Sequence, residues 1–489
     1  MDYRIVIGLE VHVQLLTKTK LFCGCSTQFG LPPNSATCPV CIGMPGVLPV
    51  MNRRAFDLAL KAAMALNCRI ASFTKWDRKN YYYPDLPKNY QISQYDLPFS
   101  EEGWLAIETA NGSKRVGIIR AHLEEDAGKM MHDEHKSGKD SLVDLNRAGT
   151  PLLEIVSKPE LEAPEDAKAY LEELRLLLKT LGVSDCEMQE GSLRCDANVN
   201  IHIPQPGGGF AATPIVEVKN LNSFRAVERS TKYEAGRQFE EFKKTGKKFG
   251  EVPKATAGWD DSRGVTVVQR RKEEASDYRY FPEPDLVPVV VETAWIEAIK
   301  AGMGELPAAQ RQRLAATYGL SAYDASVLTS QGRSLVVYFE QVAKESGDPK
   351  AACNWVTNQV LQTLNERKIE IDDFPVAAPM LAELLKQIKS TGLNMQRARE
   401  VYARMLETGA TAEKAIAELG FKVVADEGQL VEIIRRAIAD NPKAVADYKK
   451  GKVKAADAIK GAVMRETKGM AKTELVQQLL LVELDKVQG

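Results

Sequence analysis

The stretch Ile7-Gly8-Leu9-Glu10-Val11-His12-Val13-Gln14 alternates apolar and polar side chains almost without interruption. Successive side chains of a β-strand point to opposite faces, so the apolar residues share one face and Glu10, His12 and Gln14 share the other. Alternation over this length is typical of a half-buried strand. The sequence therefore predicts a strand that packs a core on one side and presents polar groups on the other.

The same alternation recurs in three later stretches, which we expect to join this strand in one sheet. Their polar faces carry Arg120, His122 and Glu124 in residues 120–126, Arg194, Asp196, Asn198, Asn200 and His202 in residues 193–202, and Glu217 and Lys219 in residues 215–219. One interpretation is an ordinary half-exposed sheet with solvated charges. The other is a functional cluster of acids, imidazoles and cations, and the alternation leaves the two about evenly balanced.

Two observations favour the cluster. Three of the five histidines, His12, His122 and His202, lie on these polar faces, and 124–126 is an acidic run. Clustered acids repel one another unless a cation lies among them. Carboxylates with a histidine suit Mg²⁺ that carries nucleotide phosphates. The sequence has no glycine-rich phosphate-binding loop, so a nucleotide would bind on the sheet itself.

The chain changes character near residue 295. Before it, short alternating segments are interrupted by helical patterns at 52–65, 164–181 and 223–245, whereas after Pro288 helical spacing is almost continuous. We therefore predict an α+β fold with a large antiparallel sheet, followed by helices. The expected domains are 1–294, an all-helical domain at 295–410 and a small helical tail at 411–489.

The composition is that of an ordinary globular protein. The 489 residues are 44% hydrophobic and 27% charged, and the net charge of -1 gives no global signal for nucleic acid. From residue 430 onward, 12 Lys and Arg stand against 8 Asp and Glu, a weak local basic excess. No stretch is apolar enough to predict a transmembrane helix, and the first residues lack the pattern of a signal peptide. We expect a cytoplasmic protein without a membrane partner.

Four of the eight cysteines are closely spaced. Cys23 and Cys25 form C-x-C, and Cys38 and Cys41 form C-x-x-C after a loop that contains glycine and prolines. This spacing predicts a tetrahedral Cys₄ zinc knuckle over residues 23–41, with a redox pair and unliganded thiols as alternatives. Four cysteines leave no open position on the metal, so we expect a structural site.

A second unusual segment is rich in tyrosine. Residues 79–91 read KNYYYPDLPKNYQ and combine four tyrosines with basic and amide side chains and two prolines. Such a loop can stack on a nucleic-acid base or the ring of ATP. The alternative is a rigid loop whose rings cover the edge of the sheet.

Seven stretches closely resemble the B-subunit family of the glutamyl/aspartyl-tRNA amidotransferases. They are IGLEVHVQL, YYYPDLPKNYQISQYD, HLEEDAGK, DLNRAGTPLLEIVSKPE, LRCDANVNI, VEVKNLNSF and DYRYFPEPDL, in chain order between residues 7 and 286. The later helices resemble that family's helical domain and tRNA-binding tail. The resemblance implies a heterotrimeric ligase of protein biosynthesis whose first domain is a cradle similar to glutamine synthetase.

The resemblance also implies a reaction. The side-chain carboxylate of Glu-tRNA(Gln) or Asp-tRNA(Asn) is phosphorylated with ATP and Mg²⁺, and ammonia then displaces the phosphate. The ammonia comes through a channel from the glutaminase, which is the amidase subunit, while a small third subunit holds the assembly together. This chain has no Ser-Ser pair, so we do not expect it to release ammonia from glutamine itself.

Carried onto this sequence, the resemblance implies a role for each polar strand residue. The expected catalytic residues are Glu10, His12, Glu124, Glu125, Glu217 and Lys219. Of these, Glu10, His12 and Glu125 hold Mg²⁺, and the acids at 124 and 217 are further ligands or proton acceptors. The expected residues for the nucleotide and the tRNA 3′ end are Tyr81, Tyr82, Lys88, Arg120, Arg194 and Asp196.

Two other functions fit the same sequence. The chain can be a non-catalytic tRNA-binding scaffold whose partner holds the active site, in which case the acids of the polar faces are dispensable. It can also be a stand-alone carboxylate–ammonia ligase, which would act on free glutamate.

Overall fold

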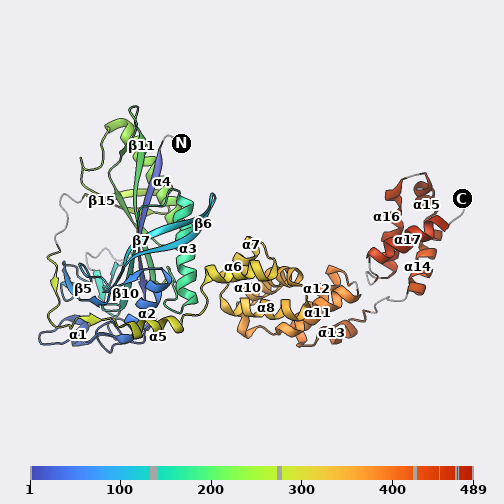
Figure 1. The fold of residues 1–489 in the computed structure, drawn as a ribbon, viewed down its shortest axis with the longest axis horizontal. Coiled ribbons are helices and arrows are strands. Elements are labelled where there is room, and N and C mark those ends of the chain that lie inside the picture. Colours follow the sequence, from blue (N-terminus) through green and yellow to red (C-terminus); the bar gives the residue numbers. More distant parts are fainter. Residues whose placement is uncertain are drawn as a thin grey trace. The chain divides into compact units, whose positions relative to one another are not determined.

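The computed structural model describes residues 3–132, 141–271, 278–391, 393–421, 427–450, 452–467, 471 and 473–486. The chain divides into two compact units, Met1–Pro307 and Ala308–Gly489 (Figure 1). The first contains a large sheet with helices, and the second is helical throughout its described part. The structure thus has the predicted α+β character.

Ten strands form the large sheet within the described residues. In spatial order they are β15 (Val265–Arg271), β14 (Ala255–Asp260), β13 (Val216–Leu221), β11 (Leu193–Pro204), β1 (Arg4–Gln14), β10 (Pro151–Ser157), β7 (Gly112–Glu125), β6 (Ser100–Thr109) and β2 (Arg69–Ile70), with β12 (Phe210–Ala212) beside β11. The strand predicted from the first residues, β1, lies in the middle of this sheet.

The prediction of an antiparallel sheet needs one correction, because the sheet is mixed. Strands β13 and β14 run parallel, whereas the other pairs in the sheet are antiparallel. Parallel neighbours need a crossover connection, and helix α4 (Phe224–Thr245) supplies it between these two strands. The sequence shows the strand–helix–strand order but not the direction in which the second strand pairs.

Helices cover the apolar face of the sheet. Helix α4 packs against β11, β13 and β15, and α3 (Pro164–Thr180) packs against β6 and α4. Helix α2 (Arg53–Ala65) packs on β7, and α5 (Thr293–Ala301) packs on α2. The short helix α1 is Pro39–Ile42. The buried apolar side chains of the strands and helices form one continuous core, so the opposite face of the sheet is left for polar groups.

Capping residues set the ends of the long helix α4. The Ser223 hydroxyl accepts a hydrogen bond from the backbone N–H of Ala226 and satisfies a donor of the first turn. At the other end, Gly246 has φ 65°, the left-handed conformation that glycine adopts without strain. These two signals explain why the sequence prediction of a helix at 223–245 agrees with the structure.

In the described part of the chain, three small sheets lie outside the large one. They are β16 (Phe281–Pro282), β4 (Asp77–Asn80) and β5 (Tyr90–Ser93); β17 (Val289–Val290) with β3 (Phe73–Thr74); and β8 (Lys129–His132) with β9 (Ser141–Asp144). The first of them brings the tyrosine-rich segment beside the chain around residue 281.

The described residues of the second unit form two separate hydrophobic cores, one from helices up to α13 and one from α14 onward. Its helices are α6 (Pro307–Tyr318), α7 (Ala322–Ser330), α8 (Arg333–Ser346), α9 (Pro349–Trp355), α10 (Leu361–Arg367), α11 (Ala378–Thr391), α12 (Met395–Thr408), α13 (Ala412–Glu418), α14 (Glu427–Asp440), α15 (Pro442–Lys449), α16 (Ala456–Glu466) and α17 (Thr473–Lys486), with a π-helical turn η1 (Val356–Val360) and 3₁₀ turns η2 (Ile371–Asp373) and η3 (Val453–Ala455). Among the described residues, no helix has both the length and the apolar character needed to cross a membrane.

Candidate functional site

Strand register places polar residues from four strands in one row on the face opposite the core. His12 on β1 is paired with Arg194 on β11 and with Glu154 on β10. Glu154 is in turn paired with His122 on β7. Glu10 lies two residues before His12 and therefore on the same face. Residues that are far apart in the sequence thus meet because their strands are neighbours.

The side chains of this row form a compact acidic cluster. The Nε2 atom of His12 lies 3.4 Å from a carboxylate oxygen of Glu154, 3.6 Å from Glu10 and 3.8 Å from Glu124. The Nε2 atom of His122 lies 3.8 Å from Glu154 and 4.0 Å from Glu124. We call these five residues the acidic cluster. They provide two overlapping sets of possible metal ligands. One set is Glu10, His12 and Glu154, and the other is His122, Glu124 and Glu154.

The charges in the acidic cluster depend strongly on one another. Burial raises the pKa of Glu124 to about 7 and lowers that of His122 to about 4. Burial also opposes a charge on His12, but the carboxylates around it outweigh burial and raise its pKa to about 9. The pKa of Glu154 lies below its usual range because His122 and His12 outweigh its burial. The carboxylates therefore favour a positive charge at the centre of the cluster. A protonated His12 supplies such a charge, and a bound metal cation would supply it as well.

Several buried polar atoms around the acidic cluster have no hydrogen-bond partner within the described part of the chain. They are Nε of Arg120, Nδ1 of His122, Oε2 of Glu124, Nε of Arg194 and Oδ1 of Asn198. Buried polar atoms are almost always hydrogen-bonded to protein or water, so such a concentration indicates a place where a ligand or ordered water completes the bonding. Carboxylate oxygens and imidazoles fit a divalent cation, and two guanidinium groups fit phosphoryl oxygens.

Glu125 does not join the acidic cluster. It follows Glu124 on β7, and neighbouring side chains of a strand point to opposite faces. Its carboxylate accepts hydrogen bonds from Nζ of Lys88 and, at 3.0 Å, from the backbone N–H of Ile92. The structure therefore does not bring Glu125 together with Glu10 and His12, the set from which a Mg²⁺ site was predicted.

Glu154 occupies the place that the sequence analysis gave to Glu125. It lies in the strand Pro151-Leu152-Leu153-Glu154-Ile155-Val156-Ser157, where most side chains are buried and alternation is therefore absent. The sequence does contain one indication of a role for Glu154, because it is the single charged residue of an apolar strand and a buried carboxylate needs a partner. The alternation pattern used to find the other polar residues does not detect it.

Glu217, Lys219 and Asp196 form a second polar group beside the acidic cluster. Nζ of Lys219 lies 2.5 Å from Asp196 and 3.1 Å from Glu217. Burial alone would lower the pKa of Lys219, but the two acids raise it above its usual value. Asp196 faces Glu10 across the β1–β11 pair. The structure thus brings three more predicted residues to the same face of the sheet.

Two residues of the predicted polar faces, Asp126 and His202, are not members of the acidic cluster. Asp126 binds Nη2 of Arg194 at 2.8 Å and accepts a hydrogen bond from Gln14 at 2.7 Å, which fixes Arg194 beside the acidic cluster. His202 instead stacks on Phe210, with ring centroids 4.0 Å apart, and binds Arg4. The third histidine of the predicted faces therefore lies outside the acidic cluster.

Among the predicted residues of the tyrosine-rich segment, one ring is partly buried and one is exposed. The Tyr81 hydroxyl donates to Oε1 of Gln91 at 3.1 Å, whereas Tyr82 is 69% exposed. Tyr81 also packs against Tyr278, and the two ring centroids are 6.1 Å apart. Tyr81 therefore packs against the chain near residue 280, whereas Tyr82 faces solvent, and stacking on a base or on ATP stays a prediction.

Lys79 connects this segment to the acidic cluster. Its ammonium lies 5.3 Å from the centre of the Tyr278 ring. Although burial opposes its charge, Glu124 and Glu154 raise its pKa above the usual range. Sequence analysis did not single out this lysine, because the residues that surround it come from other strands.

The four closely spaced cysteines come together as predicted. The Sγ atoms of Cys23, Cys25, Cys38 and Cys41 all lie within 4.8 Å of one another and can hold a metal ion. The backbone N–H of Cys38 donates to Sγ of Cys41 at 3.2 Å, an interaction typical of thiolates held by a turn. A set of four sulfur donors fits zinc and leaves no position for a substrate. The other four cysteines, at 68, 186, 195 and 353, are buried singly.

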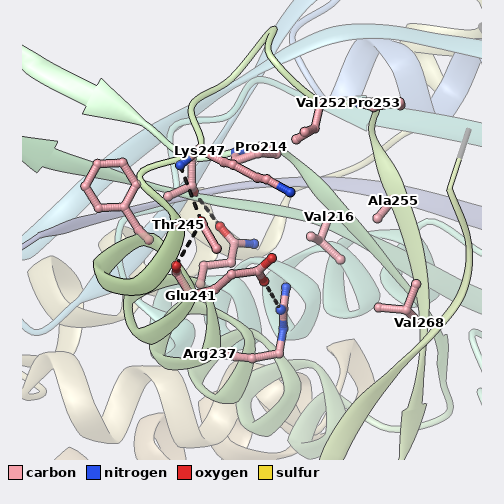
Figure 2. A pocket seen from close by; sticks show the side chains of 13 residues that line it. Pro214, Val216, Arg237, Glu241, Thr245, Lys247, Val252, Pro253, Ala255 and Val268 are labelled. Carbon is pink, nitrogen blue, oxygen red and sulfur yellow. Dashed lines mark hydrogen bonds and ion pairs between the residues drawn. The ribbon is translucent and has the colours of Figure 1, made fainter. Parts of the chain in front are cut away.

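A cavity of about 130 Å³ lies between α4 and the strands at the sheet edge (Figure 2). Its apolar wall includes Val216, Ala255 and Val268, and Arg237 lies at its side. This guanidinium binds the acids at 234 and 241, so its charge is balanced within the protein. Val216 points to the core face, so the cavity lies on the opposite side of the sheet from the acidic cluster.

The chain is similar to known proteins along nearly all of its length. Residues 5–297 match the GatB/GatE catalytic domain, and residues 337–484 match the GatB domain. The B subunit of the aspartyl/glutamyl-tRNA(Asn/Gln) amidotransferase of Rhodopirellula baltica is 52% identical over 478 residues, which are 97% of this chain and 96% of that protein. The protein with the same description from Carboxydothermus hydrogenoformans is 49% identical over 487 residues, 99% of this chain and 100% of that protein.

Proposed function

The chain belongs to the family of aspartyl/glutamyl-tRNA(Asn/Gln) amidotransferase B subunits, and from this membership we propose its reaction. It acts in the cytoplasm as part of a ligase that converts Glu-tRNA(Gln) or Asp-tRNA(Asn) into Gln-tRNA(Gln) or Asn-tRNA(Asn). ATP phosphorylates the side-chain carboxylate, and ammonia then displaces the phosphate. The amidase subunit supplies the ammonia, and a small third subunit completes the heterotrimer.

The observation that carries this proposal is the acidic cluster with its unpartnered buried atoms. Glu10, His12, Glu124 and Glu154, with His122, hold Mg²⁺ in the two overlapping ligand sets. When bound, the cation neutralises charge on the phosphates of ATP. Glu154 replaces Glu125 in this assignment because Glu125 binds Lys88 on the other face.

The cations around the acidic cluster orient the phosphoryl group. Arg120 and Arg194 each have a buried Nε atom without a partner among the described residues, and both point their guanidinium groups to the cluster side of the sheet. We assign them to oxygens of the transferred phosphoryl group, where charge develops. Lys219, held by Asp196 and Glu217, adds a third positive charge.

Two carboxylates are suited to accept the proton that ammonia loses. Without a bound cation, burial raises the pKa of Glu124 to about 7, the range in which a carboxylate serves as a base at neutral pH, so Glu124 is a base only where it is not a ligand of Mg²⁺. Glu217 is buried beside Thr256 and Lys219 and is the second candidate. Tyr81 and Tyr82 remain the proposed contacts for the adenine of ATP or for the 3′ end of the tRNA, with Lys88 nearby.

The remaining parts of the chain have supporting roles in this proposal. The residues at 1–294 form the cradle, and the cysteines at 23, 25, 38 and 41 hold a structural zinc ion in it. The helical domain is proposed at 295–410, although α5 packs on α2 and the first compact unit extends to Pro307. The residues at 411–489 bind the tRNA. Deleting 411–489 should weaken tRNA affinity more than ATP affinity, and an equal loss of both would contradict a tRNA-binding tail.

The proposed function is tested by amidation of both misacylated tRNAs. The chain is assayed with ATP, with and without the amidase partner, using glutamine or free ammonia as the nitrogen donor. We expect amidation from free ammonia without an active amidase, and from glutamine only with it. Amidation that survives replacement of the acidic cluster would instead support a scaffold whose partner holds the active site.

A further inference from the structure

Lys20 is a fully buried lysine, three residues before the first cysteine of the knuckle. Its exposed fraction is 0%, which is rare for a charged side chain. Its backbone N–H donates to the carbonyl of Cys25 at 3.0 Å, so the residue is hydrogen-bonded to the knuckle. A buried ammonium is costly unless it is paired and hydrogen-bonded.

Three acceptors surround the ammonium, two from the knuckle and one from the chain at residue 145. Nζ of Lys20 lies 2.8 Å from the carbonyl oxygen of Ala36, 3.4 Å from that of Leu145 and 3.6 Å from Sγ of Cys41. An ammonium has three N–H donors and no acceptor, so the charged form of Lys20 can donate one hydrogen bond to each of these three acceptors. A neutral amine would turn a lone pair toward one of these acceptors.

The ammonium has no carboxylate partner within 4.0 Å in the described part of the chain, so its counter-charge lies elsewhere. Glu125 lines the same 260 Å³ cavity, but its carboxylate is bound by Lys88. The sulfur of Cys41 is the remaining anionic candidate in contact with Nζ. Four thiolates carry more negative charge than one divalent ion neutralises, so a metal-loaded knuckle attracts a cation.

We propose that Lys20 is the counter-cation of the four-cysteine metal site and a positioning residue for it. The proposal rests on the zinc assignment made above and adds the reason for a buried lysine at this place. Its ammonium reduces the repulsion among the thiolates through the hydrogen bond to Cys41. Outer partners of this kind change metal affinity although they do not touch the metal.

The same lysine joins the knuckle to the sheet. Its bond to the carbonyl of Leu145 reaches the turn that continues to Gly149, whose carbonyl accepts from the N–H of Leu21 at 2.9 Å. A Cβ atom on Gly149 would lie 3.5 Å from Cys41 and 3.6 Å from Glu125. The turn at Gly149 therefore lies close to both the knuckle and Glu125.

The test compares Lys20→Met with Lys18→Met in the full-length chain. Lys18 is an exposed lysine two residues away, so its replacement removes the same charge without touching the cysteines. The zinc dissociation constant is measured by competition with a chromophoric chelator. We expect Lys20→Met to weaken zinc binding by about 10- to 100-fold, the usual effect of losing an outer partner. We expect Lys18→Met to change it less than about 2-fold, since water screens exposed charges. Equal zinc affinity of the Lys20 variant and the wild type would overturn the proposal.

A second measurement separates this role from a general folding defect. Thermal unfolding is followed with and without zinc, and the increase in Tm on adding zinc is compared between the two variants. A counter-cation role predicts that this increase shrinks for Lys20→Met and not for Lys18→Met. A Lys20 variant that loses the same stability with and without zinc would contradict it. A wild-type chain that takes up no zinc would refute the metal assignment itself, and with it the role of Lys20.

Discussion

The first unit holds two groups of residues that can bind metal, and they are built in opposite ways. The knuckle takes its four cysteines from one short segment, residues 23–41, and joins them through loops and turns. The acidic cluster takes its ligands from three strands, β1, β7 and β10, whose residues are far apart in the sequence. Four sulfur donors close the first site, whereas unpartnered polar atoms leave the second open to a ligand.

This difference matches two separate tasks. A closed site of local residues stabilises the segment that contains it, because binding the metal there is coupled to folding. An open site on a central sheet holds its ligands rigidly, because each strand is fixed by two neighbours. We therefore expect changes in the acidic cluster to reduce activity with little loss of stability, and changes in the knuckle to do the reverse.

The largest effect is expected from Glu154→Gln, since this residue is shared by both ligand sets. Amidation with free ammonia should fall by about 100- to 1,000-fold, the range seen when one charge-stabilising group is lost from an active site. The exposed Glu162 provides a matched control, and Glu162→Gln should keep nearly full activity. Similar activity of the two variants would remove Glu154 from the site.

The knuckle is tested by Cys25→Ser, with zinc content and unfolding as measurements. We expect loss of bound zinc by elemental analysis and a loss of at least about 3 kcal/mol in the stability of the first unit, because the metal contributes to folding. Amidation by the folded fraction should stay close to normal. Stoichiometric zinc in the variant would refute the four-cysteine assignment.

A smaller effect should separate the two neighbouring acids on β7. Glu124→Gln should weaken Mg²⁺ binding by about 10-fold or more, because it removes an acidic ligand from the cluster. Glu125→Gln should leave Mg²⁺ affinity unchanged, since its carboxylate binds Lys88. Isothermal titration of both variants with MgATP gives the comparison. Equal losses would mean that the ligands rearrange when metal binds.

The same contrast explains how much could be predicted from the sequence. The meeting of the four cysteines was predictable because their spacing is local. The strand β1 and the polar faces around His122 and Asp196 were predictable because alternation is also local. Glu154 was not found because β10 is buried on both faces, and Glu125 was grouped with Glu10 although adjacent strand residues point apart. The parallel pairing of β13 with β14 requires the crossover helix α4, and the residues of the two strands alone do not indicate the direction in which they pair.

The central claim is that the acidic cluster transfers phosphate to the aminoacyl side chain. The most direct test measures phosphate transfer from ATP to Glu-tRNA(Gln) by His12→Ala, in the absence of any nitrogen donor. His12 touches three acids of the cluster, so we expect phosphorylation to be lost while tRNA binding is retained. Normal formation of the acyl phosphate by this variant would contradict the account and place the chemistry outside the cluster.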